Sequence, residues 1–142
     1  MTAFALIASI CVMAAPQSAL QKAPMSLRII VLNLGEGDGP VRISVDTEES
    51  WFVDVTEPFR SYTVERTVEG AELQIDDLPP GAYALRVFHD EDGDGELKRG
   101  AFGIPAEPYG FSGLKTDRLR PKSFGDAKFV FDTTMKLTIK LR

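Results

Sequence analysis

The sequence contains one cysteine, Cys11, and one histidine, His89, among its 142 residues. Cys11 lies in an apolar N-terminal stretch that we expect to be removed, because this stretch resembles an export signal. The remaining chain then offers no disulfide, no thiolate metal site and no cysteine nucleophile. Ile10 stands before Cys11 where a small residue is expected in a lipoprotein, so lipid attachment at this cysteine is not predicted.

Basic residues are in the minority. The chain has 16 Lys and Arg against 21 Asp and Glu, which gives a net charge of −5. An acidic protein is repelled by nucleic acids and by anionic lipid surfaces. After the N-terminal stretch, no apolar run approaches the roughly 20 residues of a membrane-spanning helix. We therefore expect no nucleic-acid partner and no membrane insertion of the mature chain.

The N-terminal stretch is apolar from Ala3 to Ala15 apart from Ser9, and small residues follow it. A run of about 13 apolar residues is too short to span a bilayer but suits a secretory signal peptide. The alternative is a buried or disordered N-terminal strand. We predict a signal peptide over 1–19, a linker over 20–26 and a single domain over 27–142, located in the periplasm or secreted.

Short segments rich in β-branched and aromatic residues predict strands at 27–34, 41–46, 64–68, 72–75, 82–89, 129–131 and 135–141. The segment 27–34 is apolar enough to be buried on both faces, and the turn-forming segment 35–40 predicts a hairpin with 41–46. Between residues 47 and 62 we expect a short helix or a loop that lays Trp51 on the core. Leu78 is expected to close one end of the core.

Many short strands with turns between them and almost no helix predict an all-β fold, specifically an antiparallel β-sandwich. Its expected subtype is immunoglobulin-like or transthyretin-like. The segment Leu78-Pro79-Pro80-Gly81-x-Tyr83, which leads into a strand, is common in sandwich modules of the transthyretin-like kind. This is a resemblance of fold, and fold alone does not fix function.

An acidic loop follows the strand 82–89. Its residues Asp90, Asp92, Asp94 and Gly95 match D-x-D-x-D-G, the first half of an EF-hand-type calcium loop. Alternate carboxylates in a tight loop can point to one centre, and the seventh position, Glu96, offers a backbone carbonyl. Carboxylate and carbonyl oxygens are hard ligands that favour Ca²⁺ over zinc or copper. We predict metal ligands at Asp90, Asp92, Asp94 and Glu96.

Two later positions depart from the calcium pattern. Position nine is Lys98, whose ammonium cannot ligate a cation, and position twelve is Ala101, where a bidentate carboxylate usually closes the shell. A further ligand must come from Glu91, Glu96, water or Glu107, the last as a possible extra ligand that folds back. The alternative is a solvated acidic turn that Lys98 and Arg99 partly neutralise.

The arm 103–112 contains Pro105 and Pro108, which restrict the backbone and favour extended geometry. It can lie across a sheet edge and present Tyr109 and Phe111 as a binding face for a glycan or an extended peptide. The alternative is that both rings pack against the protein and hold the arm down.

His89 stands beside Asp90, and Glu107 can approach it, so an acid–base site is one hypothesis. The other is a hydrogen-bonded structural histidine at a strand end. An exposed His89 at the floor of a cleft would favour the enzyme, and a buried, hydrogen-bonded one would remove it.

Several segments together resemble a bacterial family of small exported proteins that is catalogued only as a domain of unknown function. They are LPPGAYA at 78–84, VFHDEDGDG at 87–95, FGIP at 102–105, Glu107, YGFS at 109–112, Phe124 and DA at 126–127. The resemblance implies a periplasmic or secreted sandwich domain and brings no activity, cofactor or partner.

We therefore carry three hypotheses of function. The first is an exported, non-catalytic module whose acidic loop binds Ca²⁺ and orders the arm for binding at the cell envelope. The second is an envelope hydrolase that uses His89 with Glu107 or Asp90. The third is a structural module without a ligand.

Overall fold

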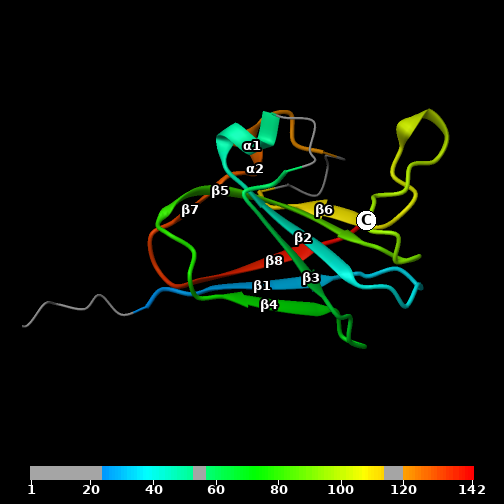
Figure 1. Cartoon of the computed structure of the whole chain (residues 1–142), viewed down its shortest axis with the longest axis horizontal. Helices are drawn as coiled ribbons and strands as arrows, with labels where there is room; N and C mark the ends of the chain where they lie inside the picture. The colour runs from blue at the N-terminus through cyan, green and yellow to red at the C-terminus, as the bar shows by residue number, and fades with distance from the viewer. Residues whose placement is uncertain (1–23, 53–56, 114–119) are drawn as a thin grey trace, which may run out of the picture.

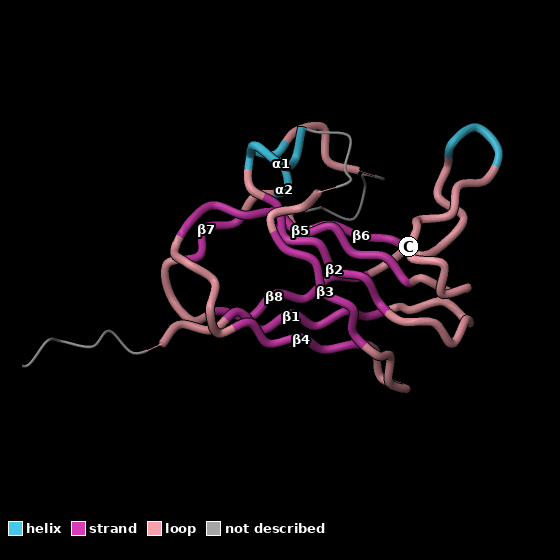
Figure 2. Tube along the Cα trace, viewed as in Figure 1, coloured by secondary structure: helices cyan, strands magenta, loops and turns pink. Residues whose placement is uncertain are grey.

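The computed structural model describes residues 24–52, 57–113 and 120–142, so the predicted signal peptide 1–19 lies outside the described residues (Figure 1). The described chain is mostly strand, with a few short helices (Figure 2). This confirms the all-β prediction. The strands are β1 Leu27–Leu32, β2 Val41–Asp46, β3 Arg60–Val64, β4 Ala71–Ile75, β5 Gly81–His89, β6 Tyr109–Phe111, β7 Phe129–Phe131 and β8 Met135–Lys140. The helices are α1 Glu48–Phe52, α2 Phe124–Ala127 and the 3-10 turn Ala101–Gly103.

The strands form two sheets. One has the order β4-β1-β8, and the other has the order β3-β2-β5-β6, with β7 also pairing with β5. Most neighbours are antiparallel, but β1 and β8 run parallel, in a register that pairs Leu27 with Met135 and Val31 with Ile139. The prediction of purely antiparallel pairing is wrong for this pair of strands.

The main core takes apolar side chains from both sheets. Alternate residues of β1 and β2 are fully buried: Leu27, Ile29, Val31, Val41, Ile43 and Val45. The prediction that the first strand is buried on both faces is wrong, because Arg28 points to solvent and pairs with Glu72 of β4 at 2.7 Å. Leu78 is buried in the same core, as predicted.

The predicted hairpin of the first two strands does not form, since β1 and β2 belong to different sheets. The Gly-rich segment 35–40 crosses between the sheets, and side chains from elsewhere hold it: His89 and Arg66 both bond to its backbone. The predicted strand 64–68 is also wrong. The strand is Arg60–Val64, and the chain then turns through a bridge between Thr67 and Gly70.

A smaller cluster covers the outer face of β5. Here Trp51 of α1 packs against Ala84, Phe124 and Ala127. This agrees with the prediction that a short helix or a loop in this region lays Trp51 on the core. Strand β6 was not predicted. Its Gly110 packs closely against β8, since a β-carbon at this position would lie 2.9 Å from Ile139 Cγ2. Among the described residues, no helix is long and apolar enough to cross a membrane.

Candidate metal centre

The end of β5 carries His89, the lone histidine. Its side chain is fully buried, and its Nδ1 accepts a hydrogen bond from the Gly35 N–H at 3.1 Å. Its Nε2 lies 3.0 Å from the Gly39 carbonyl oxygen and must donate to it. These bonds anchor the segment 35–40 to β5. Neither ring nitrogen bonds to Asp90 or Glu107.

Asp90 follows directly and is also fully buried. Its Oδ2 accepts hydrogen bonds from Arg42 Nε at 2.9 Å and from the Gly95 N–H at 3.0 Å, and Arg42 Nη2 lies at 2.9 Å. Arg42 reaches it because β2 and β5 are neighbours, with Arg42 paired to Phe88. The result is a carboxylate with one heavily bonded oxygen. Among the described residues no hydrogen-bond donor reaches the other oxygen, Oδ1.

Glu107 enters from a distant part of the chain and is buried, with 4 % of its surface exposed. Its Oε1 accepts the Glu91 N–H and its Oε2 accepts the Lys98 N–H, both at 2.9 Å. These two bonds fix the carboxylate against both ends of the acidic loop. Glu107, which the sequence named as a possible extra ligand, thus lies against the acidic loop.

Asp92 is more exposed than the other two acids. Its Oδ2 lies 3.1 Å from Lys98 Nζ. The hydrogen bond from Lys98 is the main cause that lowers the pKa of Asp92 below its ordinary value, and the same bond raises the pKa of Lys98. The side chains of Lys98 and Asp92 are 61 % and 41 % exposed, so this ion pair contributes little to stability.

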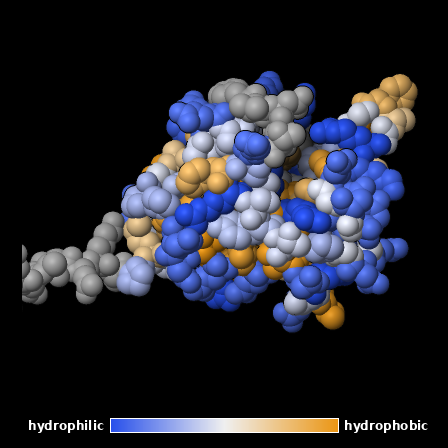
Figure 3. Space-filling view, viewed as in Figure 1, coloured by the Kyte–Doolittle hydropathy of each residue, from blue (hydrophilic) through white to orange (hydrophobic). Residues whose placement is uncertain are grey.

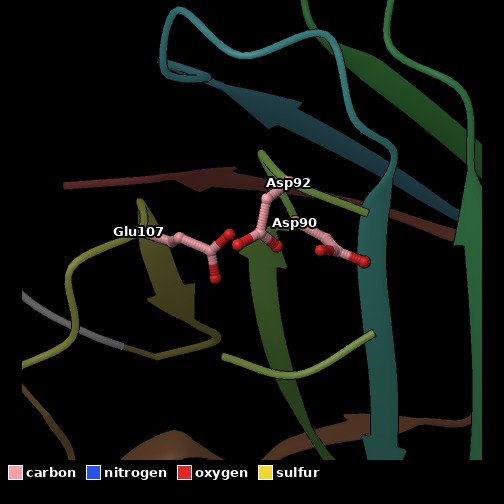
Figure 4. A group of neighbouring side chains, drawn as sticks. All are labelled: Asp90, Asp92 and Glu107. Atoms are coloured by element: carbon pink, nitrogen blue, oxygen red, sulfur yellow. The ribbon is translucent and has the colours of Figure 1, made fainter. Parts of the chain in front are cut away.

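Asp90, Asp92 and Glu107 form one group, in which each offers an oxygen within 4.8 Å of the others (Figure 4). We call this group the acidic triad. Three like charges at this distance repel one another, and burial of two of them strengthens the repulsion. Oxygen donors that converge in this way can hold a metal ion. Asp90 Oδ1 is buried without a partner among the described residues, which costs desolvation energy that a cation ligand would offset.

The other predicted ligands lie outside the acidic triad. Asp94 is exposed, and its Oδ1 accepts the Glu96 N–H at 2.8 Å. Glu96 is exposed as well. Glu91 turns toward the segment 35–40, where its Oε1 accepts the Gly37 N–H at 3.4 Å. The structure therefore assembles Asp90, Asp92 and Glu107, and it does not bring Asp94 or Glu96 into the same group.

Tyr109 and Phe111 lie on β6, paired opposite Phe88 and Arg86 of β5. Both rings are half-buried, with centroids 5.9 Å apart, and Phe111 also meets the Trp51 ring edge-on at 6.1 Å. The predicted binding residues are thus partly covered by their own neighbours.

The sequence did not identify Arg42 as the partner of Asp90, and for Lys98 it indicated only partial neutralisation of the acidic loop. Arg42 carried one local signal, because it stands among the polar residues that alternate along 41–46. Its partner is 48 positions away, and no spacing rule reaches that far.

The matching family model is described as "Uncharacterized protein conserved in bacteria (DUF2141)" and spans residues 29–139. This range contains the acidic triad and all strands except the ends of β1 and β8. No curated protein and no solved structure matches the chain.

Proposed function

Because the chain belongs to this uncharacterised bacterial family, its function rests on the site, and we propose an exported, non-catalytic β-sandwich module that binds Ca²⁺. The proposed ligands are the carboxylates of Asp90, Asp92 and Glu107. The observation that carries the proposal is the buried Asp90 Oδ1, which meets no donor among the described residues and belongs to a side chain of the acidic triad.

Calcium is the cation that suits this donor set. All three groups are hard oxygen ligands, and none is a thiolate or an imidazole. Calcium tolerates irregular geometry and takes six to eight oxygens, so water or backbone carbonyls would complete the shell. We expect weak binding, on the order of 10⁻⁴–10⁻³ M, as in other extracellular modules.

The role we propose for the ion is to order the segment that leads from the acidic loop to β6 for binding at the cell envelope. Glu107 supports this role, since its carboxylate already holds the N–H groups of Glu91 and Lys98. Export is supported by the apolar N-terminal stretch. The hydrolase alternative loses support because both nitrogens of the buried His89 are bonded to backbone.

The test is thermal unfolding in chelator and in Ca²⁺ at matched ionic strength. With a dissociation constant near 1 mM, about 10 mM Ca²⁺ should raise the melting temperature by roughly 5 °C. Asp92→Ala should abolish the rise, because it removes a ligand without opening the core.

The matched control is Asp132→Ala, which removes the same charge from an exposed position just after β7, whose Phe131 pairs with Gly81 at the end of β5 that is remote from Asp90. This variant should keep the full rise. A wild-type melting temperature that is equal in chelator and in Ca²⁺ would rule the proposal out, as would a full rise in Asp92→Ala.

Lys98 supplies a second, independent prediction. Its ammonium donates to Asp92 Oδ2 at 3.1 Å, so it lies beside the proposed cation site. Removing a positive charge a few ångströms from a divalent ion in a water-like dielectric should strengthen binding by about tenfold. Calorimetric titration of Lys98→Gln should therefore show tighter Ca²⁺ binding than the wild type, whereas Lys136→Gln, on the exposed side of β8, should not. Unchanged affinity in Lys98→Gln would place the ion away from Asp92.

A further inference from the structure

A narrow loop projects from the body of the protein beside the acidic triad. It comprises residues 98–106, which we call the finger, with the 3-10 turn Ala101–Gly103 at its tip (Figures 1 and 2). Its two sides are paired: the Gly100 N–H donates to the Ile104 carbonyl and the Ala106 N–H donates to the Lys98 carbonyl, both at 2.8 Å. The finger is therefore an ordered projection, because backbone bonds join its two sides.

The tip of the finger is apolar and open to solvent. Residues 100–106 contain no charged or hydroxyl side chain, and the tip stands out as a hydrophobic projection (Figure 3). Phe102 is 99 % exposed and Ile104 is 62 % exposed. Phe102 also has a φ of 61°, in the left-handed region that aromatic residues rarely adopt. The Phe102 ring is thus exposed to water, and its backbone adopts a conformation that is unfavourable for an aromatic residue. Both features indicate a binding surface.

The base of the finger is attached to the acidic triad. Glu107 follows the last residue of the finger, and its Oε2 accepts the N–H of Lys98, the first residue. Asp92 faces solvent at the same end of the molecule, so an ion bound here would keep coordination positions open to the outside. Arg99 lies exposed at the base and donates to the Gly103 carbonyl at 3.1 Å. A cation site, a basic side chain and an apolar tip therefore lie on one short segment.

We propose that the finger docks the protein on a phospholipid surface in the presence of Ca²⁺. The bound ion takes phosphate oxygens of the headgroups into its open positions, while Phe102 and Ile104 enter the boundary between headgroups and acyl chains. This inference rests on the proposed calcium site. The bound ion would also reduce the electrostatic repulsion between this acidic protein and an anionic membrane, because the acids around the finger repel anionic headgroups until a cation neutralises them.

A lipid surface fits the finger better than a protein pocket does. The tip is a convex projection, and its side chains offer no directional polar group for specific recognition. A lipid interface accommodates such a tip without a preformed cavity, and a nearby basic residue favours phosphate. Insertion covers only the tip, and in this respect the proposal departs from the expectation, drawn from the sequence, that the mature chain does not insert into a membrane.

The test is flotation of the whole mature chain with vesicles of equimolar phosphatidylglycerol and phosphatidylethanolamine, in Ca²⁺ and in chelator. The wild type should float with the vesicles in Ca²⁺ only. Phe102→Ser should lower the partition coefficient about tenfold or more, since it removes the largest apolar side chain of the tip. Val68→Ser is the matched control, because Val68 is 102 % exposed on the Thr67–Gly70 turn, outside the finger, and should leave flotation unchanged.

The same variants separate the two proposals. Phe102→Ser should keep the calcium-induced rise in melting temperature, whereas Asp92→Ala should lose both the rise and the flotation. If the rise occurs but the wild type stays off the vesicles, lipid docking is wrong and the calcium site stands. Flotation that is equal in chelator, or equal in Phe102→Ser and Val68→Ser, would also overturn the docking proposal.

Discussion

Replacing Asp90 with alanine should destabilise the protein by about 3 kcal/mol, near the lower end of the range for breaking a buried ion pair. The substitution leaves Arg42 and the Gly95 N–H without their acceptor. The cost stays near the lower end for two reasons. Arg42 keeps 30 % of its side chain in water, and removal of one carboxylate relieves the repulsion within the acidic triad. Urea unfolding in chelator measures this cost without a contribution from bound metal.

The control for Asp90→Ala is Glu72→Ala. Glu72 also forms a two-pronged pair with an arginine, Arg28, but both side chains are 51 % exposed. Water replaces such a partner readily, so Glu72→Ala should change stability far less than Asp90→Ala. Equal losses of stability in the two variants would show that the burial of Asp90 does not increase the cost of removing its carboxylate. That result would remove the physical basis for treating its unpaired oxygen as a ligand.

Replacing Gly39 with alanine should cost at least about 3 kcal/mol, the upper part of the range for overpacking. A β-carbon at this position would lie 1.7 Å from the Asp90 carbonyl oxygen. Neither backbone can shift freely, because the Asp90 N–H donates to the Pro40 carbonyl at 2.9 Å and His89 bonds to the Gly39 carbonyl. Relief of the clash must move Asp90, so the calcium-induced rise in melting temperature should fall as well.

The control for Gly39→Ala is Gly93→Ala, in the acidic loop. A β-carbon at Gly93 meets nothing within 4 Å, although its φ of 73° makes alanine unfavourable by roughly 1 kcal/mol. Thermal unfolding of the two variants should therefore differ widely, with Gly39→Ala the less stable. If Gly93→Ala loses as much stability as Gly39→Ala, the close approach of the segment 35–40 to Asp90 does not hold the site.

Local patterns predicted the elements that depend on neighbouring residues. The alternation along 82–89 predicted β5, and the acids and glycines after it predicted a tight acidic loop at Asp90–Gly95. The same reasoning failed where pairing is long-range. Alternating residues show that 27–34 and 41–46 are strands, but they do not show which sheet each strand joins, and the predicted hairpin was wrong for that reason.

The candidate site divides in the same way. The sequence supplied Asp90 and Asp92 through their spacing, and it kept Glu107 as one of several possible additions. The finger itself was missed, because a string of small and apolar residues at 100–106 gives no sign of whether Phe102 will be buried. Exposure of that ring depends on the pairing of both sides of the finger and on the way Glu107 holds its base.

The sequence by itself determined the strand-rich class, the excess of acids and the concentration of carboxylates after one strand, since all three follow from composition and short spacings. Only the tertiary structure decided which carboxylates meet, because the neighbouring β2 brings Arg42 to one oxygen of Asp90 and the returning chain brings Glu107 to the loop. Such meetings depend on contacts between residues far apart in the chain, and local preferences carry no information about them.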